Sequence, residues 1–340
     1  MNSTFYTIKK FAITVAILLC SSSVYAESTS KKNIVTPGII FQILASELSI
    51  ISGNVPAAAA TYVDVAERTK DPEAAKRATE LSLNLGDHET ALKTAEIWKN
   101  NSKNNSDASE AVDALQLVLG KTEKLITSMI SRRNIAHSEN TLDLFYSKLS
   151  SLVKKARDPS VGLLIFEEVS SQDRNLPEVL YTSALLHFGN SDVNQMELLL
   201  RKLIDIKPDH ANALNALGYS MADRGVNLVE AKRLIKAAMI FSPNDPHIVD
   251  SMGWIHYRMG DLLKAEEYLS VAFANQPDPE ISAHYGEVLW MLSSKEEAMS
   301  IWRVGLNQNS NNRVLLETLT RFKISVEKLL NGDNETVNSL

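Results

Sequence analysis

Seven histidines are the side chains of this sequence best suited to bind a metal ion or to transfer a proton near neutral pH. No two of them stand four residues apart, and the H-E-x-x-H pattern of a zinc site does not occur. His256 and His284 fall inside segments whose apolar residues have helical spacing. We therefore interpret these two as packing residues or as polar groups of a binding surface, and we predict no metal site.

Serine-based and glycine-based catalytic patterns are isolated or missing. S-x-x-K begins at Ser28, Ser151 and Ser325, three unrelated contexts without the companion motifs of the serine enzymes that use it. The sequence contains no G-x-S-x-G, no glycine-rich phosphate loop and no calcium loop. We therefore predict that the chain is not an enzyme and that it uses no cofactor.

Composition favours a folded helical protein with an acidic balance. The 340 residues are 44% apolar and include only 13 glycines and 10 prolines, which is globular composition compatible with helices. The formal net charge is −6, and no basic stripe stands out along the chain. Such a chain is a poor match for the phosphates of DNA or RNA, so we expect no nucleic-acid partner.

The N-terminus has the pattern of a secretory signal peptide over residues 1–26. Two lysines precede a short apolar core at 11–19, and Ala26 ends a V-Y-A cleavage pattern. We expect cleavage after Ala26 and export, followed by a disordered tail at 27–36. An uncleaved membrane anchor is the alternative.

Cys20 is the one cysteine of the sequence, and it lies just after that apolar core. A lipoprotein signal would acylate such a cysteine, but it requires a small residue before it, and here that residue is Leu19. Cleavage after Ala26 is therefore favoured, and acylation of Cys20, which would add a lipid anchor, stays an alternative. Cleavage would leave an exported chain that packing alone must stabilise.

A repeated pattern of small residues organises the C-terminal half. Gly218, Gly253 and Gly286 stand 35 and 33 residues apart, each midway along a helical segment. Alanines recur in the helical segments that follow, 34 and 33 residues apart: Ala231, Ala265 and Ala298. A mid-helix glycine costs about 1 kcal/mol relative to alanine. We therefore assign these six residues to close packing between the helices of a repeat.

A period near 34 residues built from two helices resembles the tetratricopeptide repeat. The resemblance implies an all-α solenoid of helical hairpins, a right-handed superhelix of about eight pairs with a helix that caps its end. The predicted organisation is a signal peptide at 1–26, a tail at 27–36, degenerate repeat-like pairs at 37–135, repeats at 136–312 that are clearest at 177–310, a capping helix at 313–330 and a tail at 331–340.

In that family the first helix of each pair lines a concave groove. The resemblance therefore implies a partner-binding groove formed by these residues: Tyr181, Asn215, Tyr219, Asp250, Trp254, Tyr257, Arg258, Glu287 and Trp290. Aromatic residues beside arginine are typical of binding hot spots. Packing against a neighbouring helix is the alternative for Trp254 and Trp290, whereas Trp98 and Trp302 fall at core positions of second helices.

Two C-terminal segments, one of which reads DSMGWIHYRMGDLLKAEEYL, also resemble a group of exported proteobacterial repeat proteins. Several members of that group are outer-membrane lipoproteins, and one type is the adaptor of a carboxyl-terminal processing protease of the periplasm. The resemblance implies a non-catalytic periplasmic scaffold that binds an envelope protein such as a protease or a peptidoglycan enzyme. It leaves association with the outer membrane open. An assembly factor for pili, secretion or exopolysaccharide export is the alternative.

Overall fold

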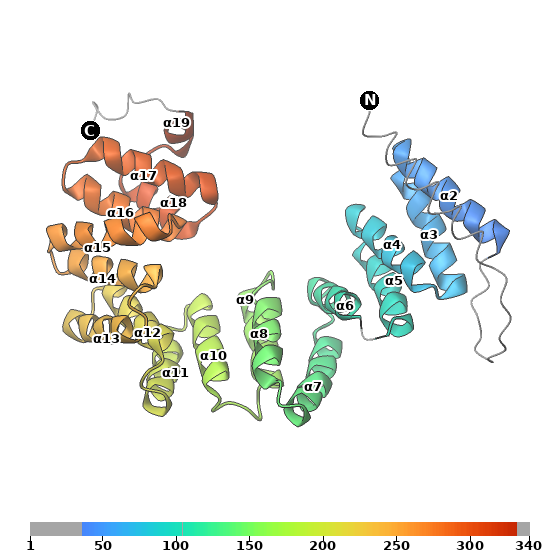
Figure 1. Cartoon of the computed structure of the whole chain (residues 1–340), viewed down its shortest axis with the longest axis horizontal. Coiled ribbons are helices and arrows are strands. Elements are labelled where there is room, and N and C mark those ends of the chain that lie inside the picture. Colours follow the sequence, from blue (N-terminus) through green and yellow to red (C-terminus); the bar gives the residue numbers. More distant parts are fainter. Residues whose placement is uncertain (1–35, 104, 332–340) are drawn as a thin grey trace. The chain divides into compact units, whose positions relative to one another are not determined.

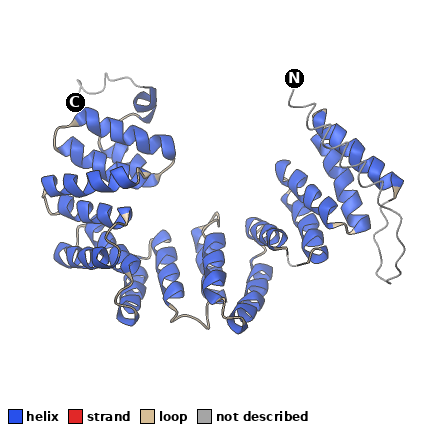
Figure 2. Ribbon diagram, viewed as in Figure 1, coloured by secondary structure: helices blue, strands red, loops and turns tan. Residues whose placement is uncertain are grey.

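The structure is a computed structural model that describes residues 36–103 and 105–331. The predicted signal peptide, the tail up to residue 35 and the tail from residue 332 lie outside the described residues. Within them the chain forms 18 helices and no strand (Figure 1, Figure 2). No helix of this described part is both long and apolar enough to cross a bilayer.

The first 16 of these helices follow one another as eight helix–turn–helix pairs, as the sequence predicted. The pairs are α2 (Pro37–Ile51) with α3 (Val55–Thr69), α4 (Pro72–Asn84) with α5 (His88–Asn101), α6 (Ser106–Val118) with α7 (Thr122–Ser138), α8 (Leu142–Val153) with α9 (Pro159–Val169), α10 (Pro177–Gly189) with α11 (Val193–Ile206), α12 (Ala211–Arg224) with α13 (Leu228–Phe241), α14 (Pro246–Arg258) with α15 (Leu262–Asn275), and α16 (Pro279–Met291) with α17 (Lys295–Gln308). Two shorter helices follow them, α18 (Arg313–Arg321) and α19 (Val326–Asn331).

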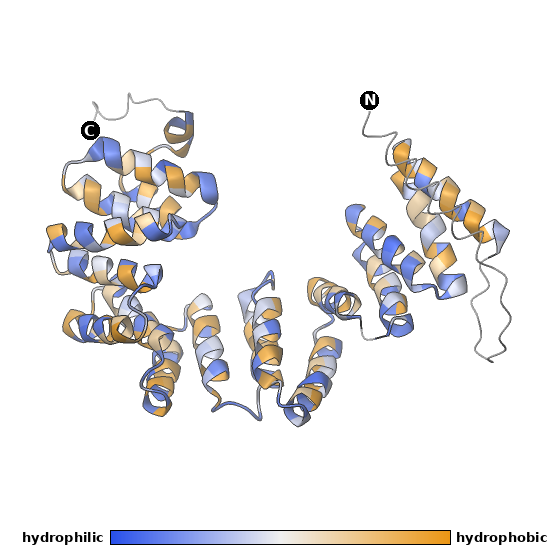
Figure 3. Ribbon diagram, viewed as in Figure 1, coloured by the Kyte–Doolittle hydropathy of each residue, from blue (hydrophilic) through white to orange (hydrophobic). Residues whose placement is uncertain are grey.

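The chain divides into two compact units, one that ends at Val112 and one that begins at Asp113. Hydrophobic and hydrophilic residues alternate along the helices of both units, as expected for helices that bury one side against their neighbours (Figure 3). The second unit contains the three clearest repeats and the candidate site.

Asp-Pro steps fix where four helices begin. The side chains of Asp71, Asp158, Asp245 and Asp278 each accept a hydrogen bond of 2.8 or 2.9 Å from a backbone N–H of the first turn. The proline that follows each aspartate lacks an N–H, and its fixed φ suits the first turn of a helix. These caps set the starts of α4, α9, α14 and α16.

The repeated small residues lie where the two helices of a pair touch. A Cβ at Gly218 would lie 2.7 Å from Cγ1 of Ile235 and 2.9 Å from the carbonyl oxygen of Ala231. A Cβ at Gly253 would lie 2.5 Å from Cγ of Leu269. Gly286 packs in the same way against the indole ring of Trp302 on its partner helix. Ala231, Ala265 and Ala298 have no exposed surface.

The predicted continuous helix at 313–330 is wrong, because the chain turns after Arg321. Lys323 adopts a left-handed conformation with φ of 57°, and the N–H of Ile324 donates to the carbonyl of Leu319 over 2.9 Å. The turn brings Ile324 into the core that also contains Leu329. Burial of these two side chains favours the break, and the short helix α19 then begins after Ser325.

Candidate functional site

A groove of about 840 Å³ lies in the second unit. Its lining comes from α10, α12, α14, α16 and α18, with one residue from the turn before α18: Phe188, Tyr219, Asp223, Trp254, Arg258, Glu280, His284, Asn311, Arg313, Val314, Leu316, Glu317, Thr318, Thr320 and Arg321. Polar and charged side chains make up most of this lining. The groove therefore differs from the mainly apolar pockets that enclose small molecules.

A buried ion pair joins α14 to α16 beneath the groove. Nδ1 of His284 lies 2.9 Å and 3.0 Å from the two carboxylate oxygens of Asp250, and both side chains are buried. Burial by itself lowers the pKa of His284, but attraction by Asp250, with smaller contributions from Glu280 and Glu287, outweighs it and raises that pKa overall. The pair is consequently an ionic link between neighbouring repeats.

The side chain of Trp254 packs against His284 of the ion pair and against residues at the C-terminal end of α14. Its ring stacks on His284 with a centroid distance of 4.1 Å and on Tyr257 with a distance of 4.9 Å. The guanidinium carbon of Arg258 lies 5.9 Å from its ring centroid. The side chain is only 3% exposed, and its indole Nε1 has no hydrogen-bond partner among the described residues.

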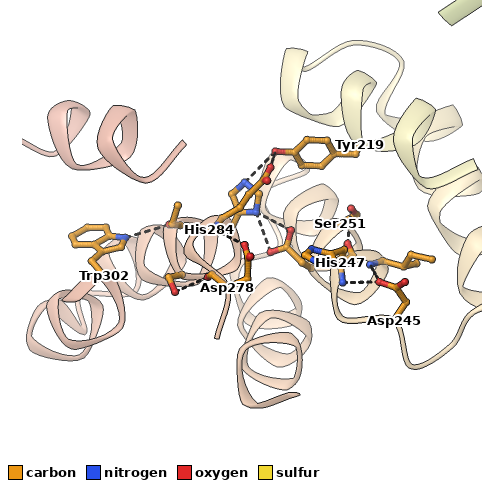
Figure 4. Close-up of polar contacts among 12 residues, drawn as sticks. Tyr219, Asp245, His247, Ser251, Asp278, His284 and Trp302 are labelled. Carbon is orange, nitrogen blue, oxygen red and sulfur yellow. Dashed lines mark hydrogen bonds and ion pairs between the residues drawn. The ribbon is translucent and has the colours of Figure 1, made fainter. Parts of the chain in front are cut away.

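Tyr219 connects α12 to the same place. Its hydroxyl donates to Oε1 of Glu280 over 2.7 Å and lies 3.4 Å from Nε2 of His284 (Figure 4). Burial, together with the carboxylates of Glu280, Asp223 and Asp250, raises the pKa of Tyr219 well above its ordinary value, so the hydroxyl keeps its proton. We refer to one set of residues as the polar cluster: Tyr219, Asp250, Trp254, Glu280 and His284.

Glu287 holds α14, α16 and α18 together. Its buried carboxylate accepts hydrogen bonds from the hydroxyl of Tyr257 over 2.8 Å and from Nη2 of Arg321 over 2.6 Å. Burial, with the charge of Glu287 next to it, raises the pKa of Tyr257. Since Arg321 comes from α18, this contact fixes the helix that forms one wall of the groove.

Three of the nine residues predicted for the groove line it: Tyr219, Trp254 and Arg258. Asp250 and Glu287 instead lie beneath the lining, with exposed fractions of 4% and 2%. Their carboxylates bind side chains of neighbouring helices. The helical period identified the face on which they stand, but the packing of α18 and α16 decides their depth.

The other four predicted residues, Tyr181, Asn215, Tyr257 and Trp290, do not line this groove. The packing alternative describes both tryptophans: Trp254 is buried and stacks on His284 of α16, and the ring of Trp290 stacks on Trp302 at 5.6 Å and contacts Phe322 at 5.7 Å. The ring centroid of Tyr181 lies 5.3 Å from that of His210, the residue that caps the start of α12. The expected core positions of Trp98 and Trp302 are confirmed, because both are buried.

The contribution of α18 to the groove was not predicted from the sequence. Arg313, Thr320 and Arg321 line it, although their segment was expected only to cap the end of the repeats. A partial signal exists, because the apolar residues Leu315 and Leu319 leave a second, polar face on this helix. What that face contacts depends on how the preceding repeats curve.

No family model matches the chain. A TPR repeat-containing protein of Pseudomonas aeruginosa is 50% identical over 116 residues, which are 34% of this chain and 19% of that protein. This identity agrees with the eight helix pairs and with the glycine and alanine spacings near 34 residues. The chain has the fold of a tetratricopeptide repeat protein. It spans about a fifth of the length of this curated TPR relative.

Two solved TPR structures are similar to the chain. A thermophilic TPR protein of Thermus thermophilus is 21% identical, with a TM-score of 0.45, over 52% of this chain and 94% of that chain. A tetratricopeptide repeat protein of Parabacteroides merdae is 15% identical, with a TM-score of 0.46, over 84% of this chain and 98% of that chain.

The TPR fold implies a scaffold for protein–protein interactions, because stacked helix pairs form an extended surface on which another chain can lie. Such a surface suggests protein partners, and TPR proteins are in general not catalysts. The polar cluster agrees with such a role, because its acid, imidazole and hydroxyl groups are already bonded to one another.

Proposed function

We propose that this chain is a non-catalytic scaffold of the periplasm and that the groove binds a segment of an envelope protein. The observation that carries the proposal is the groove itself, in which side chains from five helices converge on one open space of about 840 Å³. Because its lining is mixed and open, it suits an extended or helical segment of another chain.

The side chains at the base of the groove are already held in place by contacts within this chain. The polar cluster connects α12, α14 and α16 through hydrogen bonds and stacked rings, and Glu287 connects α14 and α16 to α18. A surface that is already ordered loses little conformational entropy on association. Tyr219, Trp254 and Arg258 are residue types that contribute strongly to interfaces.

Photo-crosslinking in cells tests the groove. A photoreactive amino acid replaces Thr320, which is exposed in the groove, and in a control variant it replaces Ser300, which is exposed on α17 outside it. We expect an envelope protein to crosslink at Thr320 and not at Ser300. Crosslinks from Ser300 alone, or from neither position, would contradict the proposed role.

The identity of the crosslinked protein separates the two functions. A processing protease or a peptidoglycan enzyme supports an adaptor, whereas pilus, secretion or exopolysaccharide components support an assembly factor. We favour the adaptor because the two C-terminal segments resemble a group of exported repeat proteins, one type of which is a protease adaptor.

The periplasmic location is proposed from the signal-peptide pattern of residues 1–26. Mass measurement of the purified native chain tests it. A chain that begins at Glu27 supports a released periplasmic protein, and a chain that begins at an acylated Cys20 supports a lipid anchor in the outer membrane. An intact N-terminus at Met1 would contradict cleavage.

A further inference from the structure

Every arginine that lines the groove already has an acceptor. Arg313 pairs with Glu317 over 3.1 Å, and Arg321 pairs with Glu287 over 2.6 Å. The guanidinium of Arg258 donates to the backbone carbonyl of Asp223. The positive charges of the groove are therefore directed toward groups of this chain.

Two carboxylates of the lining differ, because neither forms an ion pair in the part of the chain that the structure describes. Glu280 accepts a hydrogen bond from the hydroxyl of Tyr219, which is neutral, and forms no ion pair there. Asp223 is exposed, and no hydrogen bond or ion pair of its carboxylate is found among the described residues. Both acids lie in the groove with their charge available.

The charges of these two carboxylates both affect the hydroxyl of Tyr219. Burial is the largest cause of the raised pKa of Tyr219, and the charges of Glu280 and Asp223 both add to it. Glu280 accepts a hydrogen bond from the hydroxyl of Tyr219, and Asp223 stands one helical turn after Tyr219 on α12, so both acids lie near one another in the lining. Asp250, which adds to the same shift, lies buried behind it.

A second feature of the lining points to a bound segment. Trp254 is 97% buried (3% exposed), and its indole N–H lacks an acceptor among the described residues. A polar group that is buried without a partner costs free energy, so such groups are normally bonded to protein, water or ligand. This N–H has almost no accessible surface, so a backbone carbonyl of a peptide segment would reach it only after the ring shifts.

We propose that the segment bound in the groove carries a lysine or arginine side chain, seated against Asp223 and Glu280. This inference rests on the proposed function and specifies the chemistry of its partner. A cation there gains two carboxylates that form no ion pair among the described residues, and it would compete with His284, which lies near Glu280. An acidic segment would meet the same carboxylates and be repelled. A metal ion is disfavoured because no group of three or more suitable ligands occurs across residues 36–103 and 105–331.

The test uses the full chain and short peptides selected against it by phage display. The selected peptides are synthesised with a fluorophore, and their binding is measured by fluorescence anisotropy. Thr320→Arg, which fills the groove, shows which peptides bind there. Among these we expect one basic position to recur, and its replacement by glutamine should weaken binding at least about tenfold.

Variants of the protein complete the test. Asp223→Asn and Glu280→Gln keep the shape of each side chain and remove its charge, and each should weaken the same peptides about tenfold. The matched control is Glu267→Gln, which removes a charge at an exposed site on α15 outside the groove and should have no such effect.

The outcomes separate the two proposals. If groove-bound peptides share no basic residue, if they bind Asp223→Asn and Glu280→Gln as tightly as wild type, or if Glu267→Gln weakens them equally, the basic-partner proposal is overturned while groove binding stands. If Thr320→Arg blocks no selected peptide, or if no peptide is selected, the proposed function fails as well.

Discussion

Two helix pairs reach close contact by different means. In α4 and α5 small residues face one another, and Ala75, Ala78, Ala91 and Ala95 have no exposed surface. In α16 and α17 the small partner is Gly286, and it receives the largest side chain of the core, Trp302. The second arrangement depends more on a single residue, because one added methyl group would lie within 2.6 Å of three ring atoms of the fully buried Trp302.

Their buried polar groups differ as well. The first pair buries two hydroxyls, Thr79 and Thr94, whose oxygens lie 2.9 Å apart. The region of α14 and α16 buries ionised partners, Asp250 with His284. Replacing a buried ion pair with apolar residues is often neutral or stabilising, so such a pair is weak evidence for a role in stability alone. The buried groups of α4 and α5 therefore serve packing, whereas those of α14 and α16 also position residues that line the groove.

Removal of one partner of the buried ion pair should have the largest effect. Asp250→Ala leaves His284 buried without its carboxylate, and we expect a loss of about 3–5 kcal/mol in the free energy of unfolding. Urea titration measures the loss. Asp143→Ala, at an exposed acid on α8, is the control and should change stability little. Equal losses for Asp250→Ala and Asp143→Ala would mean that the buried ion pair contributes no more to stability than an exposed acid.

Gly286→Ala should come next. The new Cβ would overlap the ring of Trp302, and overpacking of this kind costs about 1–3 kcal/mol, more than the helix propensity that alanine adds. Gly189→Ala is the matched control, because a Cβ there meets nothing within 4 Å. Thermal unfolding should show a lower midpoint for the first variant only. A midpoint for Gly286→Ala at or above wild type would mean that the contact is not tight.

The contribution of the ion pair should also depend on pH. The folded-state pKa of His284 is raised above its ordinary value of 6.5, so the stabilisation is complete below that value and is lost as pH rises through the folded pKa. The advantage of wild type over His284→Gln, measured by urea titration between about pH 5 and pH 9, should therefore fall with rising pH. An advantage that grows with pH would show that the histidine is neutral in the folded protein.

Thr94→Val should have the smallest effect. Valine removes the hydrogen bond to Thr79, but the hydroxyl of Thr79 still donates to the carbonyl of Ala75 over 2.8 Å. No buried donor is left unpaired, so we expect a loss of about 1 kcal/mol or less. Thr127→Val, at an exposed hydroxyl on α7, provides the baseline for the same titration. A loss as large as that of Asp250→Ala would make the two kinds of buried contact equivalent.

The architecture was predictable because it depends on periodic features. Gly218, Gly253 and Gly286 recur at the spacing of the repeat, and Asp-Pro steps mark helix starts such as those of α14 and α16. Each of these signals acts within one pair of helices. The eight pairs therefore followed from the sequence, as did the close approach of the helices within a repeat.

The site was only partly predictable because its residues meet across repeats. The helical period placed Trp254 and Trp290 on the same face of successive first helices, yet one lines the groove and the other lies under Phe322. The difference arises from the turn after Arg321, where Ile324 is drawn into the core. Ser325 followed by Glu327 was the one local sign of a new helix start there. Partner binding by the nine predicted residues stays a prediction.

α18 covers the core of α16 and α17 and also forms a wall of the groove. α18 has only nine residues, and short helices that pack through one face open locally with less free energy than long, fully packed ones. Whenever α18 detaches, Arg321 leaves Glu287 and the groove loses a wall. A bound segment must therefore suppress this fraying by mass action. Slower amide hydrogen exchange along α16–α18 would then report that the groove is occupied, even when the identity of the partner is not known.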